Sequence, residues 1–174
     1  AESVHDTPEA DASIARTAGT VCVIQVADCL PVLLADRSGR MVAAAHAGWR
    51  GLAGGVLDNT LAAINCAGVP SSAIIAYIGP GIGPQAFEVG DDVRAAYVER
   101  DAETENAFVP RGRGKWLADL PALARRALLA VQPDRDSSRF PLHAQALGVQ
   151  AHLERVALHR GAREAGPGAG GRRR

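Results

Sequence analysis

The chain has 174 residues, a length that favours a single domain, and 47% of them are hydrophobic, which is enough to bury a core. Disorder throughout the chain is therefore excluded. The 19 basic residues balance the 19 acidic ones. A net charge of zero creates no field that draws a protein to nucleic acid or to an anionic membrane, so we expect neither partner.

The cysteines and the N-terminal residues indicate the cellular setting. Cys22, Cys29 and Cys66 are odd in number and do not make a complete disulfide framework, which favours a reducing compartment. Residues 1–20 mix acids with small residues, and no stretch reaches the roughly 18 apolar residues of a membrane span. These features predict a cytoplasmic protein.

Three short apolar runs near the start of the chain predict strands. Residues 20–26 (TVCVIQV) and 31–35 (PVLLA) are rich in β-branched and apolar side chains, as buried strands are. A turn at residues 36–39 leads to the third run, residues 41–45. The last two runs predict a β-hairpin.

Glycines and prolines divide the middle of the chain. The glycine-rich residues 48–55 predict a turn, and leucines at helical spacing then predict an amphipathic helix that ends near Gly68 and packs on the sheet. Residues 73–78 predict another buried strand. The glycines and prolines of residues 79–84 exclude regular structure and predict a shaped loop.

The second half of the chain predicts helices and then a tail. One helix is expected from Asp91 or Asp92 to Tyr97, and another from Pro121 to Ala130. Charged and turn residues dominate from residue 131, so residues 131–174 are predicted to be partly disordered. The order of elements predicts a mixed α and β fold.

Two reactive side chains stand at the ends of the predicted hairpin. Cys29 precedes one strand and His46 follows the other, so pairing of the strands brings them to the same end. A cysteine beside a histidine can act as a nucleophile, and both side chains can also bind zinc. Their spacing matches neither a CxxC nor an HExxH motif, which leaves both chemistries open beside a purely structural role.

The residues after His46 predict a binding loop. A guanidinium beside free backbone N–H groups at a helix start can bind phosphate, and an indole ring between glycines can stack on a nucleobase. The residues concerned are Gly48, Trp49, Arg50 and Gly51. The later loop, residues 79–90, has no dinucleotide-binding or P-loop spacing, but it could wall a pocket with Gln85 as a hydrogen-bonding residue.

Three blocks of the sequence resemble the YfiH-like laccase-domain family, also called multicopper polyphenol oxidoreductase laccases and studied as purine nucleoside phosphorylases. The blocks are ADCLPVLLAD from Ala27, AAAHAGWRGLAGGVL from Ala43 and IGPGIGPQAFEVGDDV from Ile78. They occur in the family's order and at its separations. With ADAS from Ala10 and GKWLADL from Gly114, the resemblance covers about residues 11–130.

The resemblance implies a single-domain, four-layer α/β/β/α sandwich, a fold also found in a bacterial toxin deamidase domain. It implies a core over residues 1–130, incomplete at the N-terminus, because the family's Gln-Val-His motif upstream of the ADAS segment is absent. It also implies a metal centre of two histidines and one cysteine. Cys29 and His46 match two of these ligands, whereas His5 lies too close to Ala10 to match the third.

The function implied by the resemblance is a metal-dependent purine nucleoside enzyme. It would catalyse phosphorolysis of adenosine, inosine, guanosine and methylthioadenosine, and deamination of adenosine, with nucleoside and phosphate as partners and zinc as cofactor. Cys29 and His46 would hold the metal, Arg50 would bind phosphate, and Asp28 would orient a ligand or Arg50. One alternative is copper-dependent polyphenol oxidation, for which five histidines are few. Another is an inactive or non-catalytic fragment.

Overall fold

The computed structural model describes residues 9–131. The strands are β1 (Ala12–Ala15), β2 (Leu30–Asp36), β3 (Val42–Ala47), β4 (Ile74–Ile78), β5 (Glu88–Gly90), β6 (Phe108–Gly112) and β7 (Lys115–Ala118). The α-helices are α1 (Trp49–Ala53), α2 (Val56–Cys66), α3 (Asp91–Val98) and α4 (Leu120–Ala130). The candidate ligand His5 and the predicted tail beyond Val131 lie outside the described residues.

The larger sheet is antiparallel, with strand order β1-β3-β2-β4. Its centre is the predicted hairpin, which is confirmed: Pro31 of β2 pairs with His46 of β3. The hairpin turn is held by the buried carboxylate of Asp36, which accepts hydrogen bonds from Arg40 Nε (2.7 Å) and Ser38 Oγ (2.8 Å). Burial raises the pKa of Asp36, but these hydrogen bonds outweigh it and lower the pKa to about 2.

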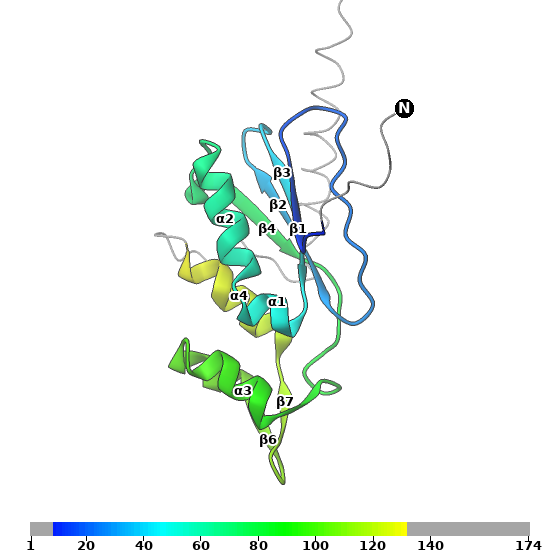
Figure 1. Ribbon diagram of the computed structural model, residues 1–174, viewed down its shortest axis with the longest axis vertical. Helices are drawn as coiled ribbons and strands as arrows, with labels where there is room; N and C mark the ends of the chain where they lie inside the picture. The colour runs from blue at the N-terminus through cyan, green and yellow to red at the C-terminus, as the bar shows by residue number, and fades with distance from the viewer. Residues whose placement is uncertain (1–8, 132–174) are drawn as a thin grey trace, which may run out of the picture.

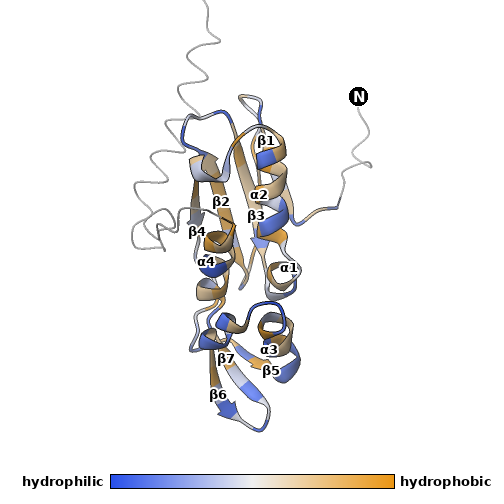
Figure 2. Ribbon diagram, turned by 90° about the vertical axis from the view of Figure 1, so that its left-hand side faces the viewer, coloured by the Kyte–Doolittle hydropathy of each residue, from blue (hydrophilic) through white to orange (hydrophobic). Residues whose placement is uncertain are grey.

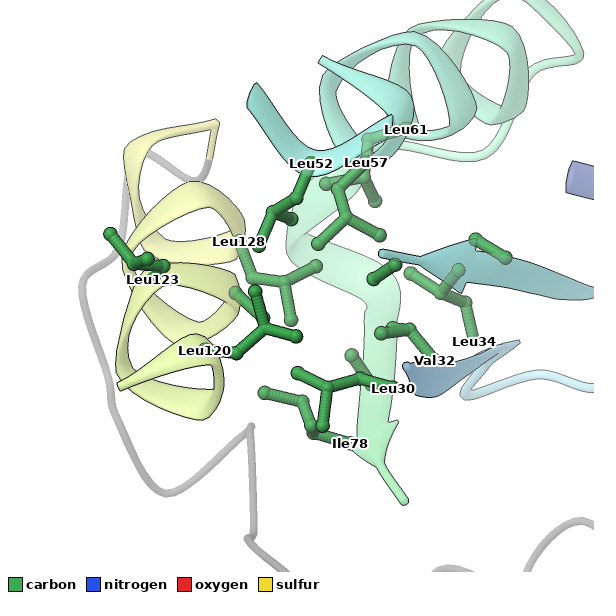
Figure 3. Packing of buried hydrophobic residues seen from close by; sticks show 14 of the residues in the cluster. Leu30, Val32, Leu34, Leu52, Leu57, Leu61, Ile78, Leu120, Leu123 and Leu128 are labelled. Atoms are coloured by element: carbon green, nitrogen blue, oxygen red, sulfur yellow. The ribbon is translucent and has the colours of Figure 1, made fainter. Parts of the chain in front are cut away.

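A layer of helices covers one face of this sheet (Figure 1). Short alanine side chains at the centre of β3 let the helices approach closely, and the leucines of α1, α2 and α4 fill the space between (Figure 3). Helix α4 begins where Asp119 accepts a hydrogen bond from the backbone N–H of Ala122 (2.9 Å). The side chains drawn between the layers include Leu30, Val32, Leu34, Leu52, Leu57, Leu61, Ile78, Leu120, Leu123 and Leu128.

The smaller sheet, of order β5-β7-β6, lies with α3 at one end of the molecule (Figure 1). Hydrophilic residues gather on its β6–β7 hairpin, as Figure 2 shows. Val89, Tyr97 and Phe108 from this part belong to the same buried cluster as Leu30 of the larger sheet. One continuous core therefore joins both sheets, which confirms a mixed α+β fold in a single domain.

The prediction of a strand at residues 20–26 is wrong. This segment belongs to neither sheet, whereas the less apolar β1 pairs with β3. Strand formation needs a hydrogen-bonding partner as well as suitable side chains, and sequence alone does not reveal the partner.

The glycine-rich residues 48–55, predicted to form a turn, contain helix α1. The helix begins with a hydrogen bond from the Leu52 N–H to the Gly48 carbonyl oxygen (2.9 Å). The chain then turns at Gly55, whose φ of 86° is in the left-handed region, before α2 begins. Glycine weakens a helix by only about 1 kcal/mol relative to alanine, so packing of Leu52 in the core can outweigh it. Within residues 9–131, no helix is long and apolar enough to cross a membrane.

Candidate functional site

Strands β2 and β3 bring Cys29 and His46 together. Cys29 directly precedes β2, and His46 is the last but one residue of β3, opposite Pro31. The antiparallel register therefore places the thiol and the imidazole at the same end of the hairpin, as the sequence predicts. Both side chains are half-buried.

Gly48 marks the point at which these two side chains converge. A Cβ atom added to Gly48 would lie 3.0 Å from Cys29 Sγ and 3.7 Å from His46 Nε2. Its φ and ψ of −74° and 164° are open to any residue, so the close approach, and not the backbone conformation, calls for glycine here. The sulfur and the ring nitrogen thus border one small space above Gly48.

Asp11 contacts both the backbone and the ring of His46. The His46 N–H donates to the Asp11 carbonyl oxygen (2.7 Å), and the imidazole Nδ1 lies 3.6 Å from Asp11 Oδ1. The two ring nitrogens therefore face different neighbours, because Nδ1 lies near the Asp11 carboxylate and Nε2 lies near Gly48 and Cys29. Asp11 was not predicted as a site residue, although it lies in the ADAS segment.

The glycine-rich loop after β4 packs against the backbone around Cys29. The Ile82 N–H donates to the Asp28 carbonyl oxygen (2.7 Å), and a Cβ on Gly81 would lie within 3.1 Å of both the Asp28 and Cys29 carbonyl oxygens. The loop therefore presses against the backbone on either side of the thiol and fixes its place. The Asp28 carboxylate is exposed and has no partner in the described part of the chain.

Trp49 and Arg50, the two residues directly after Gly48, contact each other. The Arg50 guanidinium carbon lies 4.3 Å from the Trp49 ring centre, and no carboxylate pairs with Arg50 among residues 9–131. The guanidinium thus covers one face of the indole and keeps its N–H edge available. Tyr97, whose pKa is raised by burial, donates its hydroxyl proton to the Trp49 carbonyl oxygen (2.9 Å) and ties the start of α1 to α3.

Gly51 and Gln85 occupy different surroundings. A Cβ on Gly51 would lie 3.8 Å from Asp11 Oδ2, so Gly51 belongs to the group around His46. Gln85 lies in the exposed turn of residues 84–86 and makes no hydrogen bond with another described residue. Its predicted ligand contact stays a prediction.

Cys29 and His46 supply part of a binding site for a soft or borderline metal. Thiolate sulfur and imidazole nitrogen are zinc and copper ligands, and the space above Gly48 lies between them. Catalytic zinc sites usually have three protein ligands, but the described residues contain no group of three or more metal-binding side chains. Cys29 and His46 therefore supply two donors of an incomplete set.

The structure thus defines an α+β protein that gathers a thiol, an imidazole and a carboxylate at one end of a sheet. The chain belongs to the family described as multi-copper polyphenol oxidoreductase laccase, whose model matches residues 1–136. This membership confirms the resemblance drawn from the three sequence blocks.

Two curated relatives carry names of one activity. Purine nucleoside phosphorylase PA4543 of Pseudomonas aeruginosa is 53% identical over 117 residues, which are 67% of this chain and 47% of that protein. Purine nucleoside phosphorylase YfiH of Escherichia coli is 52% identical over 122 residues, which are 70% of this chain and 49% of that protein. The chain thus spans about half the length of these relatives.

Solved structures agree on the fold. Protein NMB0706 of Neisseria meningitidis superposes with a TM-score of 0.68 at 54% identity, over 72% of this chain and 50% of that one. YlmD of Geobacillus stearothermophilus superposes with a TM-score of 0.65 at 28% identity, over 78% of this chain and 50% of that one. Both likenesses support the mixed α+β fold.

Proposed function

We propose that this chain carries a site for phosphorolysis of purine nucleosides, with inosine and adenosine as the first substrates to test. The observation that carries the proposal is the convergence of Cys29 Sγ and His46 Nε2 above Gly48, with Asp11 behind the imidazole. The names of the two curated relatives support the choice of reaction.

Phosphorolysis joins a phosphate oxygen to C1′ of the ribose and breaks the bond from C1′ to the purine nitrogen. The purine leaves with the electron pair of that bond, so the reaction needs a bound phosphate and stabilisation of negative charge on the base. Arg50 is suited to the first task, because its guanidinium is exposed and its N–H edge is free to bind two phosphate oxygens.

His46 and Asp11 are suited to the second task. Asp11 lies 3.6 Å from Nδ1 and would orient the ring, so that Nε2 would hold, beside Cys29, the metal that stabilises this charge. Trp49 is only partly buried against the core, and the exposed part of its ring would stack on a flat base beside Arg50. The exposed Asp28 would orient a ligand from the edge of the site.

Zinc is the metal we propose for this site, held by Cys29, His46 and a third group. When bound, zinc would supply positive charge that stabilises anionic oxygen or nitrogen, the chemistry that adenosine deamination would also use. Copper-dependent polyphenol oxidation is the weaker candidate, because multicopper centres need many imidazoles and His46 is the only histidine among residues 9–131.

The test is phosphate-dependent release of hypoxanthine from inosine, followed by chromatography, together with elemental analysis for metal. Cys29→Ala should abolish both activity and bound zinc. Cys66→Ala is the matched control, because Cys66 is an exposed free thiol at the end of α2, and this variant should match the unsubstituted protein. Undiminished base release by Cys29→Ala would refute the proposal.

A further inference from the structure

Helix α1 carries two of the residues proposed to bind substrate, Trp49 and Arg50, but it is poorly suited to hold its own shape. It has only five residues, and an isolated helix shorter than about 12 residues is marginal in water. Half of residues 48–55 are glycines, which lose more backbone freedom on folding than other residues do. Contacts with other elements must therefore fix the place of α1.

Two side chains, Tyr97 of α3 and Arg100 just after it, bond to the two ends of α1, which lies next to α3 (Figures 1 and 2). The Tyr97 hydroxyl donates to the carbonyl oxygen of Trp49, the first residue of α1 (2.9 Å). The Arg100 guanidinium donates from Nη1 to the carbonyl oxygen of Ala53, the last residue. The last carbonyl groups of a helix have no partner within it, so Arg100 satisfies one of them.

Arg100 is itself oriented at the junction of α1 and α2. Its Nη2 lies 4.0 Å from Oδ2 of Asp58, in the first turn of α2. A Cβ on Gly55 would lie 3.2 Å from this carboxylate oxygen and 3.5 Å from Arg100 Nη2, so the guanidinium lies close to the turn between the helices. Because the Arg100 side chain is 54% exposed, it adds little to the core, and its contacts with the two helices are its main contribution.

We propose that Arg100 is a positioning residue, which holds the end of α1 and thereby places the Arg50 guanidinium to bind phosphate. This inference rests on the proposed function. The Gly54 N–H donates to the Arg50 carbonyl oxygen (2.7 Å), so the backbone of Arg50 is linked to the end of α1 that Arg100 holds. The metal donors Cys29 and His46 lie at the end of the β2–β3 hairpin instead. Arg100 therefore acts on the binding of phosphate and not on the metal centre.

The experiment is steady-state phosphorolysis of inosine by Arg100→Met, a variant that keeps an apolar stem but has no donor. The KM for phosphate should rise about 3- to 10-fold, as expected for loss of one hydrogen bond, while kcat and zinc content stay unchanged. A purely structural loss would instead lower the folded fraction, and with it kcat, at an unchanged KM. Arg100→Lys should restore much of the KM, because an ammonium group can still donate to the Ala53 carbonyl oxygen. Arg94→Met is the matched control, because Arg94 of α3 pairs with Glu105 and stacks on Trp116.

Hydrogen exchange tests the hold on α1 independently of activity. The amides of Leu52, Gly54 and Gly55 donate the hydrogen bonds that form and end this helix. In Arg100→Met these amides should exchange about 3- to 10-fold faster, whereas those of the β2–β3 hairpin should not change. In Arg94→Met both sets should exchange as in the unsubstituted protein.

Three results would overturn the proposal. The first is equal exchange of the α1 amides in Arg100→Met and Arg94→Met, and the second is an unchanged KM for phosphate in Arg100→Met. The third is a KM that rises as much in an Arg50→Met background, because Arg100 is proposed to act through Arg50. If the unsubstituted protein releases no hypoxanthine while the α1 amides respond to Arg100→Met, the proposed function is refuted, and the placing of Arg50 for phosphate with it, whereas the hold of Arg100 on α1 is supported.

Discussion

Gly48→Ala tests the convergence of the thiol and the imidazole with a single methyl group. The new Cβ would lie 3.0 Å from Cys29 Sγ, short of the ordinary contact distance of roughly 3.5 Å or more. Relief of this contact moves the sulfur by about half an ångström, whereas metal–ligand distances tolerate only about 0.2 Å. We therefore expect zinc affinity and kcat/KM for inosine to fall by about 10- to 100-fold.

The stability of the protein should change little in the same variant. The φ and ψ of Gly48 suit alanine, and the lower entropy of the unfolded chain stabilises the fold by about 0.4–1 kcal/mol. Loss of glycine at the start of α1 costs a similar amount, so the free energy of unfolding should stay within about 1 kcal/mol. Gly48→Ala should therefore lose activity while keeping its stability.

The assay compares metal content, phosphorolysis and urea unfolding with those of Gly83→Ala. Gly83 is the matched control because a Cβ there would meet no atom within 4 Å, and its φ is not in the left-handed region. Gly83→Ala should keep full activity. If Gly48→Ala equals Gly83→Ala in activity and zinc content, Cys29 and His46 do not act together above Gly48, and the proposed site is wrong.

Three further substitutions test two carboxylates and the link between α1 and α3. Asp11→Asn keeps the size of the side chain but removes the charge facing His46 Nδ1, so kcat/KM should fall by about 10- to 100-fold with an altered pH–rate profile; an unchanged profile would argue against an orienting carboxylate. Asp36 has its pKa lowered from 3.8 to about 2, so its stabilising effect is present above pH 4 and lost as the pH falls through 2. In urea unfolding, Asp36→Asn should therefore lower the free energy of unfolding by about 1–2 kcal/mol at pH 7, a range that allows for solvent screening, and change it little at pH 2. A loss independent of pH would contradict this. Tyr97→Phe removes the hydroxyl that donates to the Trp49 carbonyl oxygen, and the free energy of unfolding should fall by about 0.5–1.5 kcal/mol.

The hairpin that carries the site could be predicted because its determinants are local. Residues 31–35 and 41–45 are separated by a short turn, so the register that joins Pro31 to His46 follows from the turn between them. The meeting of Cys29 with His46 then needs no information from distant residues. Helices α2 and α4 were predictable for the same reason, since the leucine spacing and Pro121 are local features.

The remaining strands depend on pairings that no local pattern reveals. Strand β1 has only four residues, and it is selected by pairing with β3, about 30 residues further along the chain. Strand β6 contains a proline and is mostly exposed, so it lacks the apolar alternation of a buried strand. Conversely, residues 20–26 have strong strand character but pair with no strand among the described residues. Propensity identified the segments that could form strands, but not those that do.

Strand β1 and the site residue Asp11 both escape prediction from the sequence, and for the same reason. The backbone hydrogen bond from the His46 N–H to Asp11 and the approach of the Asp11 carboxylate to Nδ1 both occur where β1 enters the sheet. Docking of β1 therefore fixes the backbone and the ring of His46 together, while the hairpin fixes Cys29 on the other side of the ring. An imidazole held between a carboxylate and a thiol needs both strand pairings, one local and one distant. Only the local one can be predicted from the spacing of residues in the sequence.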